Sequence, residues 1–134
     1  TNITSYYKEA IMSGLILQFA YNYTDVNRPK LRNFKEMMAL ANYLEKQNLV
    51  EQFSTFANKN GLQRRNLMIK KSHTLLETFL NSRIIYNMLD EQAWTQYINQ
   101  DDPVVRKAVY VFDHHEAFPK KPAAKATVSN KKKR

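Results

Sequence analysis

The sequence predicts an all-α fold: a compact bundle of five or six helices in residues 1–116, followed by a basic, flexible tail in residues 117–134. Apolar side chains recur every three or four residues through most of the chain, which is the spacing of one helix face. No segment of alternating apolar and polar residues is long enough to predict a strand. With 134 residues, the chain has the length of one domain with a single modest core.

The first three predicted helices each carry an apolar stripe. The first begins after Thr4 or Ser5 as an N-cap and should end at Asn27-Arg28-Pro29, because proline disfavours helical geometry in the residue before it. The third should stop at Asn60-Gly61, where glycine can adopt the left-handed conformation of a helix C-cap. The three stripes are Met12, Leu15, Ile16, Phe19 and Tyr23; Phe34, Met37, Met38, Ala41 and Leu44; and Leu49, Phe53, Phe56 and Ala57.

The predicted fourth helix is the longest and ends near Leu89. Asp90 can cap a short fifth helix, in which Trp94 is expected to anchor the core with its indole N–H near a polar partner. Asp102 can cap a sixth helix, whose first turn accommodates Pro103. The inward-facing residues of these helices are Ile69, Leu75, Leu76, Phe79, Leu80 and Ile84; Trp94, Tyr97 and Ile98; and Val105, Ala108, Val109 and Phe112.

Composition and spacing exclude several kinds of site. The absence of cysteine excludes a thiol nucleophile and a Cys-bound zinc, and two glycines cannot form a phosphate-binding loop or a nucleophile elbow. Lys71 and Ser72 are adjacent on a helix, so they do not face each other as a Ser–Lys dyad must. His114 and His115 point about 100° apart on a helix and cannot easily share a metal. We therefore predict no catalytic residue, no cofactor and no metal in this chain, and no apolar run approaches the roughly 18 residues that span a bilayer.

The net charge of +9 is concentrated in the tail. The tail has no acidic residue, whereas residues 1–116 hold 14 basic and 12 acidic residues and are therefore close to neutral. A second basic group at residues 64–71, formed by Arg64, Arg65, Lys70 and Lys71, is expected to be a solvated face. The candidate contacts with an anionic partner are Lys120, Lys121, Lys125, Lys131, Lys132, Lys133 and Arg134.

A series of motifs runs in a fixed order through residues 1–112. It consists of Phe19-Ala20-Tyr21-Asn22-Tyr23 with Asn27-Arg28, Phe34-Lys35, the central Arg83, Ala93-Trp94-Thr95-Gln96-Tyr97, and Asn99-Gln100-Asp101-Asp102-Pro103-Val104-Val105-Arg106-Lys107-Ala108. In this order and spacing, the motifs resemble the C-terminal helical domain of carboxy-terminal processing peptidases, the tail-specific serine proteases of bacterial envelopes.

The resemblance implies a non-catalytic domain of a larger enzyme. In such peptidases a serine hydroxyl attacks the peptide carbonyl, a lysine amine is the general base and a PDZ domain presents the substrate, all upstream of Thr1 in the family pattern. The implied partners are those protease and PDZ domains, protein substrates and a second copy of the chain, in the periplasm or at the cell surface. The alternative is an independent helical module whose basic tail binds nucleic acid or another acidic partner; the near-neutral body disfavours nucleic acid.

Overall fold

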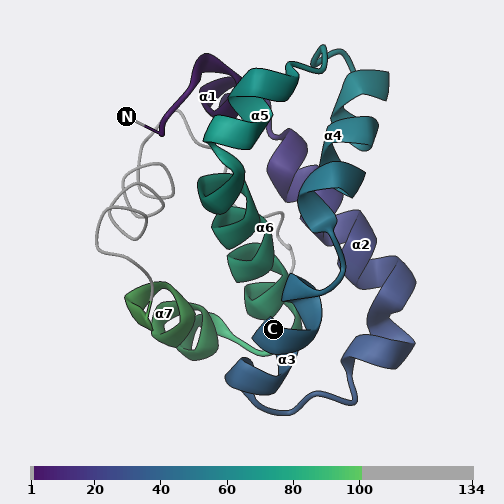
Figure 1. The fold of residues 1–134 in the computed structure, drawn as a ribbon. Helices are drawn as coiled ribbons and strands as arrows, with labels where there is room; N and C mark the ends of the chain where they lie inside the picture. The colour runs from purple at the N-terminus through teal and green to yellow at the C-terminus, as the bar shows by residue number, and fades with distance from the viewer. Residues whose placement is uncertain (1, 101–134) are drawn as a thin grey trace.

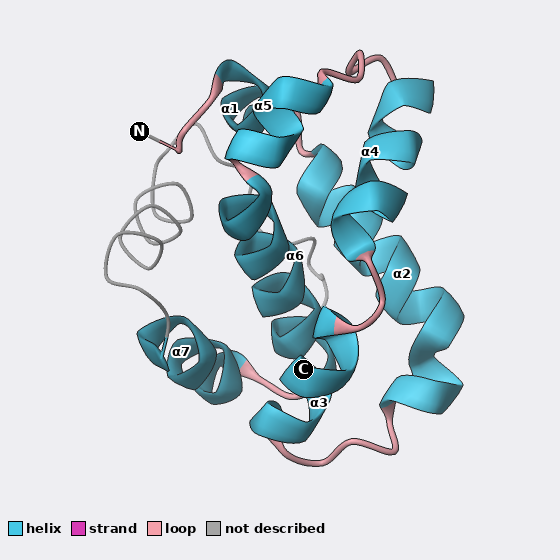
Figure 2. Ribbon diagram, in the orientation of Figure 1, coloured by secondary structure: helices cyan, strands magenta, loops and turns pink. Residues whose placement is uncertain are grey.

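The structure, a computed structural model, describes residues 2–100, which form seven α-helices and no strand. The helices are α1 (Ser5–Met12), α2 (Leu15–Leu31), α3 (Met37–Glu45), α4 (Leu49–Lys59), α5 (Asn66–Lys71), α6 (His73–Met88) and α7 (Glu91–Gln100). Short loops join them into a compact bundle (Figures 1 and 2). The all-α prediction is confirmed, with two more helices before residue 101 than the sequence predicted. None of the described helices is long and apolar enough to cross a membrane.

Helix α6 lies at the centre of the bundle, between α2 and α4 on one side and α7 on the other (Figure 1). Every residue from Thr78 to Ile85 is buried, because neighbouring helices cover all sides of α6. Two of the polar residues among them form hydrogen bonds within the bundle. The Ser82 hydroxyl donates to the Phe79 carbonyl at 2.8 Å, and the Asn81 amide donates to the Tyr97 hydroxyl at 3.4 Å, which links α6 to α7.

The first predicted helix is in fact two helices, α1 and α2. Gly14 separates them with a φ of 81°, a left-handed conformation that glycine adopts without the steric cost of a side chain. Because α1 ends there, Met12 leaves the predicted stripe and is 47% exposed. Leu15, Ile16 and Phe19 are buried as predicted.

The predicted end of this segment at Asn27-Arg28-Pro29 is wrong, since α2 continues to Leu31. Pro29 lies in the last turn of α2, where its missing N–H removes one helical hydrogen bond. Leu31 is fully buried, and the free energy of burying this side chain offsets the lost bond.

The second stripe needs a smaller correction. Met37, Ala41 and Leu44 are buried on α3, but Met38 is 49% exposed. Phe34 precedes the helix and is half-buried, with its ring centroid 4.9 Å from that of Tyr43. The stripe therefore begins later than the sequence predicted, and Met38 remains available at the surface.

The fourth predicted helix is divided into α5 and α6 at Ser72. Ser72 is fully buried, and its hydroxyl lies 2.8 Å from the Thr4 hydroxyl and donates to the Asn2 carbonyl. These bonds attach the N-terminal segment to the corner between α5 and α6. The backbone therefore turns at Ser72 to meet a partner that is distant in the sequence.

Several predicted helix ends are confirmed. Thr4 caps α1 by accepting a hydrogen bond from the Tyr7 amide at 3.2 Å, and Asp90 caps α7 by accepting one from the Ala93 amide at 2.8 Å. Gly61 follows α4 with a φ of 101°. The sixth predicted helix and the basic tail lie outside the described residues.

Candidate functional site

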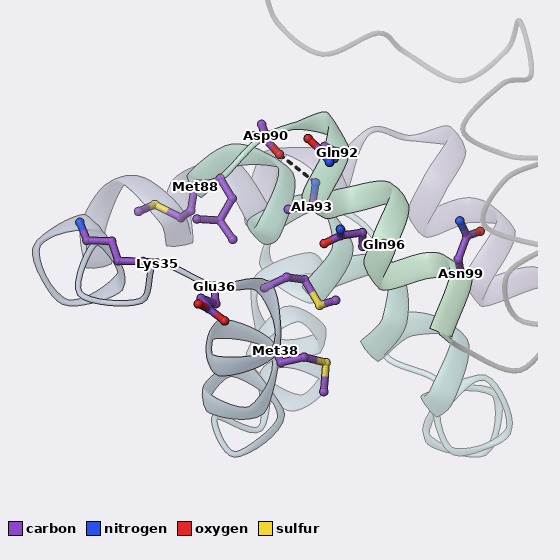
Figure 3. A pocket seen from close by; sticks show the side chains of 11 residues that line it. Lys35, Glu36, Met38, Met88, Asp90, Gln92, Ala93, Gln96 and Asn99 are labelled. Atoms are coloured by element: carbon purple, nitrogen blue, oxygen red, sulfur yellow. Dashed lines mark hydrogen bonds between the residues drawn. The ribbon is translucent and has the colours of Figure 1, made fainter.

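An open groove of about 770 Å³ lies where the start of α3, the end of α6 and α7 meet (Figure 3). Three methionine side chains contribute to its wall, so we call it the methionine groove. It is lined by Lys35, Glu36, Met37, Met38, Met88, Leu89, Asp90, Gln92, Ala93, Gln96 and Asn99. The lining combines apolar side chains with charged side chains and with side-chain amides on α7.

The methionine groove follows from how α6, α7 and α3 pack. The Asp90 cap fixes the first turn of α7 directly after α6 ends, and both helices pack against α3. Met37 is 8% exposed and belongs to the core, whereas Met38 is half exposed and Met88 is half-buried. Methionine has a flexible, polarizable side chain that adapts to differently shaped partners. The methionines therefore give the groove adaptable apolar contacts.

Basic side chains stand at one end of this groove. Lys35 is part of its wall, and Nη1 of Arg28 lies 3.9 Å from Sδ of Met88. Arg32 follows Arg28 by one helical turn and is also exposed. We call Arg28, Arg32 and Lys35 the basic corner. None of the three forms an ion pair with a carboxylate of residues 2–100, and the negative end of the α2 dipole favours cations there.

The seven tail cations that the sequence singled out all lie outside the described residues. Of the second basic group, Arg65, Lys70 and Lys71 are exposed around α5. Arg64 instead pairs with Glu51 at 2.5 Å, and this hydrogen bond lowers the pKa of the Glu51 carboxyl. Its guanidinium also donates to Asn66 at 2.7 Å, so Arg64 is held in a local network rather than presented to a partner.

The sequence reasoning missed the basic corner, although a signal was present. Residues 28–35 read Arg-Pro-Lys-Leu-Arg-Asn-Phe-Lys, with a basic residue at every second or third position. Pro29 was instead interpreted as marking the end of a helix. The remaining basic residue of this segment is Lys30. Its Nζ lies 5.6 Å from the centroid of the Tyr43 ring, and Lys30 is not one of the residues that line the groove.

No catalytic arrangement is found in the part of the chain that the structure describes. All five serines there donate to partners that cannot act as a base: Ser5 to the Met68 sulfur, Ser13 to the Ala10 carbonyl, Ser54 to that of Val50, Ser72 to that of Asn2 and Ser82 to that of Phe79. No group of three or more His, Cys, Asp or Glu side chains in this region is placed to hold a metal ion. His114 and His115 lie outside it.

Comparison with known proteins gives a family but no activity. The model of a family of unknown function (DUF8443) matches residues 6–90, from α1 to the cap of α7. No curated protein and no solved structure matches the chain. Because the match covers well over half of the 134 residues, the chain belongs to this family of unknown function.

Proposed function

We propose that this chain is a non-catalytic helical domain of a larger envelope serine endopeptidase, and that it acts through contacts with other polypeptides. The order of the motifs along residues 1–112 supports this origin. The side chains that carry the resemblance also have structural roles. Phe19 and Ala20 belong to the core, and Trp94 and Tyr97 bury α7 against α6.

Arg83, the central arginine of the resemblance, is buried in α6 with only 7% of its surface exposed. Its guanidinium carbon lies 4.6 Å from the centre of the Tyr86 ring, a distance at which a cation is attracted to the aromatic face. A charge held this deeply is expensive to desolvate. Helix formation alone would not require a buried arginine at this position. The burial of Arg83 is therefore consistent with its place in the motif series.

The observation that carries the non-catalytic assignment is the bonding of the serines. A nucleophilic serine needs a base within hydrogen-bond reach and an oxyanion hole beside it. Each described serine instead bonds to a main-chain carbonyl or a thioether. The domain therefore offers surfaces for contact with other polypeptides, and one of them is the methionine groove.

The coding sequence upstream of Thr1 tests this proposal most directly. We expect it to encode a PDZ domain and a protease core with a serine nucleophile and a lysine base. The purified chain alone should leave an unfolded protein substrate intact. Hydrolysis that disappears when one of its own serines is replaced by alanine would contradict the proposal.

The second candidate is an independent module that binds an acidic partner, and the unpaired basic corner favours it. The two candidates differ in what precedes Thr1. An upstream sequence without a protease core, together with binding of an acidic partner by the chain alone, would select the second.

A further inference from the structure

We infer that the methionine groove and the basic corner together bind an acidic polypeptide segment that carries apolar side chains. The inference rests on the proposed function only in naming the source of that segment, a protein substrate of the parent enzyme.

The apolar half of the surface is the exposed methionine. A large apolar side chain that stays half exposed costs stability relative to burial, and Met38 stays so beside an open groove. Met88 faces the same groove from the end of α6 (Figure 3). Leucine or phenylalanine side chains of a partner can displace water from both thioethers, as amphipathic segments do in other apolar grooves.

The charged half is the basic corner. Arg28 touches Met88, so its guanidinium lies at the edge of the apolar surface rather than on a separate face. Arg28 and Lys35 have no carboxylate partner among residues 2–100, so both are free to pair with acids of an incoming segment. Two acids, Glu36 and Asp90, also border the groove, but the three cations of the basic corner outnumber them. The cationic end therefore attracts acidic residues and fixes the direction of the segment.

The polar border favours a polypeptide over a nucleic acid. Gln92 and Gln96 lie one helical turn apart on α7, and their amides can exchange hydrogen bonds with a peptide backbone. A nucleic acid requires cations along its whole path to neutralise successive phosphates, and the cations here stand at one end only. No aromatic side chain lines the groove to stack on a base.

The test measures fluorescence anisotropy of a labelled peptide in which Leu and Phe recur every three or four residues, with Glu and Asp between them. A matched peptide carries Lys in place of each acid. The full chain is used with its seven tail cations replaced by glutamine, so that the tail does not bind the peptide by charge. We expect the acidic peptide to bind and the lysine peptide not to bind. Met38→Ser and the pair Arg28→Gln with Lys35→Gln should each weaken binding about fivefold or more.

The matched control is the double variant Lys70→Gln with Lys71→Gln, which removes the same amount of charge. Both residues belong to α5, which lies at the top of Figure 1, whereas α3 lies at the bottom. It should leave the affinity unchanged. Equal weakening by this control, equal binding of the lysine peptide, or no effect of Met38→Ser would each overturn the inference. Displacement of the acidic peptide by single-stranded oligothymidylate that depends on Arg28 and Lys35 would also overturn it, because the corner would then be a nucleic-acid site.

All five substituted positions of the body are exposed, so the variants are expected to fold, and circular dichroism verifies this. The two proposals fail separately. Loss of specific peptide binding would overturn this inference but would not contradict the proposal that the chain is a domain of a larger peptidase. An upstream sequence without a protease core overturns the proposed function and leaves the measured peptide binding standing.

Discussion

At the residue scale, Trp94 is buried on α7 as the sequence predicted, but its indole Nε1 has no hydrogen-bond partner among residues 2–100. The expected polar partner is therefore absent from the described structure. Burial of the large apolar ring stabilises the fold, whereas burial of the N–H without a hydrogen bond destabilises it. The two contributions can be separated by mutation.

Replacing Trp94 with alanine should lower the free energy of unfolding by about 3–5 kcal/mol, the range for a large buried aromatic side chain. Replacing it with phenylalanine should cost less, because the smaller phenyl ring keeps part of the buried apolar area and no hydrogen bond is lost. Chemical denaturation followed by circular dichroism measures both. An unchanged midpoint for Trp94→Ala would show that the side chain does not anchor α7.

The phenols of Tyr6 and Tyr7 provide a pH prediction. Burial raises the pKa of both hydroxyls above the value of an exposed tyrosine, and for Tyr6 the nearby Ser54 hydroxyl and the Arg64 charge offset this only in part. A group with a raised folded-state pKa contributes stability that is present below its unfolded pKa of about 10 and lost as the pH rises above it.

The protein should therefore unfold in alkali as these tyrosines ionise. Tyr7→Phe should move that transition to higher pH, because it removes one phenol and keeps the ring. Tyrosinate absorbance recorded together with circular dichroism monitors both events, and Tyr21→Phe, which changes an exposed ring, is the matched control. An alkaline transition that Tyr7→Phe does not move would place its cause elsewhere.

At the element scale, the sequence predicted the buried stripes and most caps, because these depend on local spacing. It missed the separations at Gly14 and Ser72. Ser72 lies in a continuous helical pattern, and its turn is explained only by a partner 68 residues earlier, Thr4. A contact between residues so far apart cannot be predicted from the local spacing of apolar residues.

Gly14→Ala tests the separation between α1 and α2. Alanine must adopt the left-handed conformation there, which should cost about 1–2 kcal/mol of stability. Gln18→Ala, on the exposed face of α2, should change it by less than about 0.5 kcal/mol. Thermal unfolding of the two variants gives the comparison, and equal midpoints would mean that α1 and α2 can join without strain.

At the scale of the whole molecule, charge is divided between a strongly basic tail and a nearly balanced body. Nonspecific binding of polyanions should therefore belong to residues 117–134. Replacing the seven tail cations with glutamine should abolish most binding to an anionic polymer such as heparin, and wild-type affinity should fall steeply with salt. Titrations at two salt concentrations measure this, and equal binding by both chains would assign the polyanion site to the body.

The candidate site was less predictable than the fold. The methionine groove joins residues 35–38 with residues 88–99, and this juxtaposition depends on how α3 and α7 pack against α6. Met38 was expected to face the core because it falls on a helical stripe. Only the three-dimensional arrangement shows that α3 begins at Met37 and leaves Met38 half exposed.

The bonds of the Ser72 hydroxyl have a consequence for amide hydrogen exchange. One oxygen atom holds both the Asn2 carbonyl and the Thr4 hydroxyl, so the start of α1 and the corner before α6 share a single attachment. Segments that share an attachment open together rather than fraying independently. In the wild-type protein, the first turns of α1 and α6 should therefore exchange with the same opening free energy. Ser72→Ala should lower the protection of both turns, while the middle of α6 keeps its protection until the whole molecule unfolds.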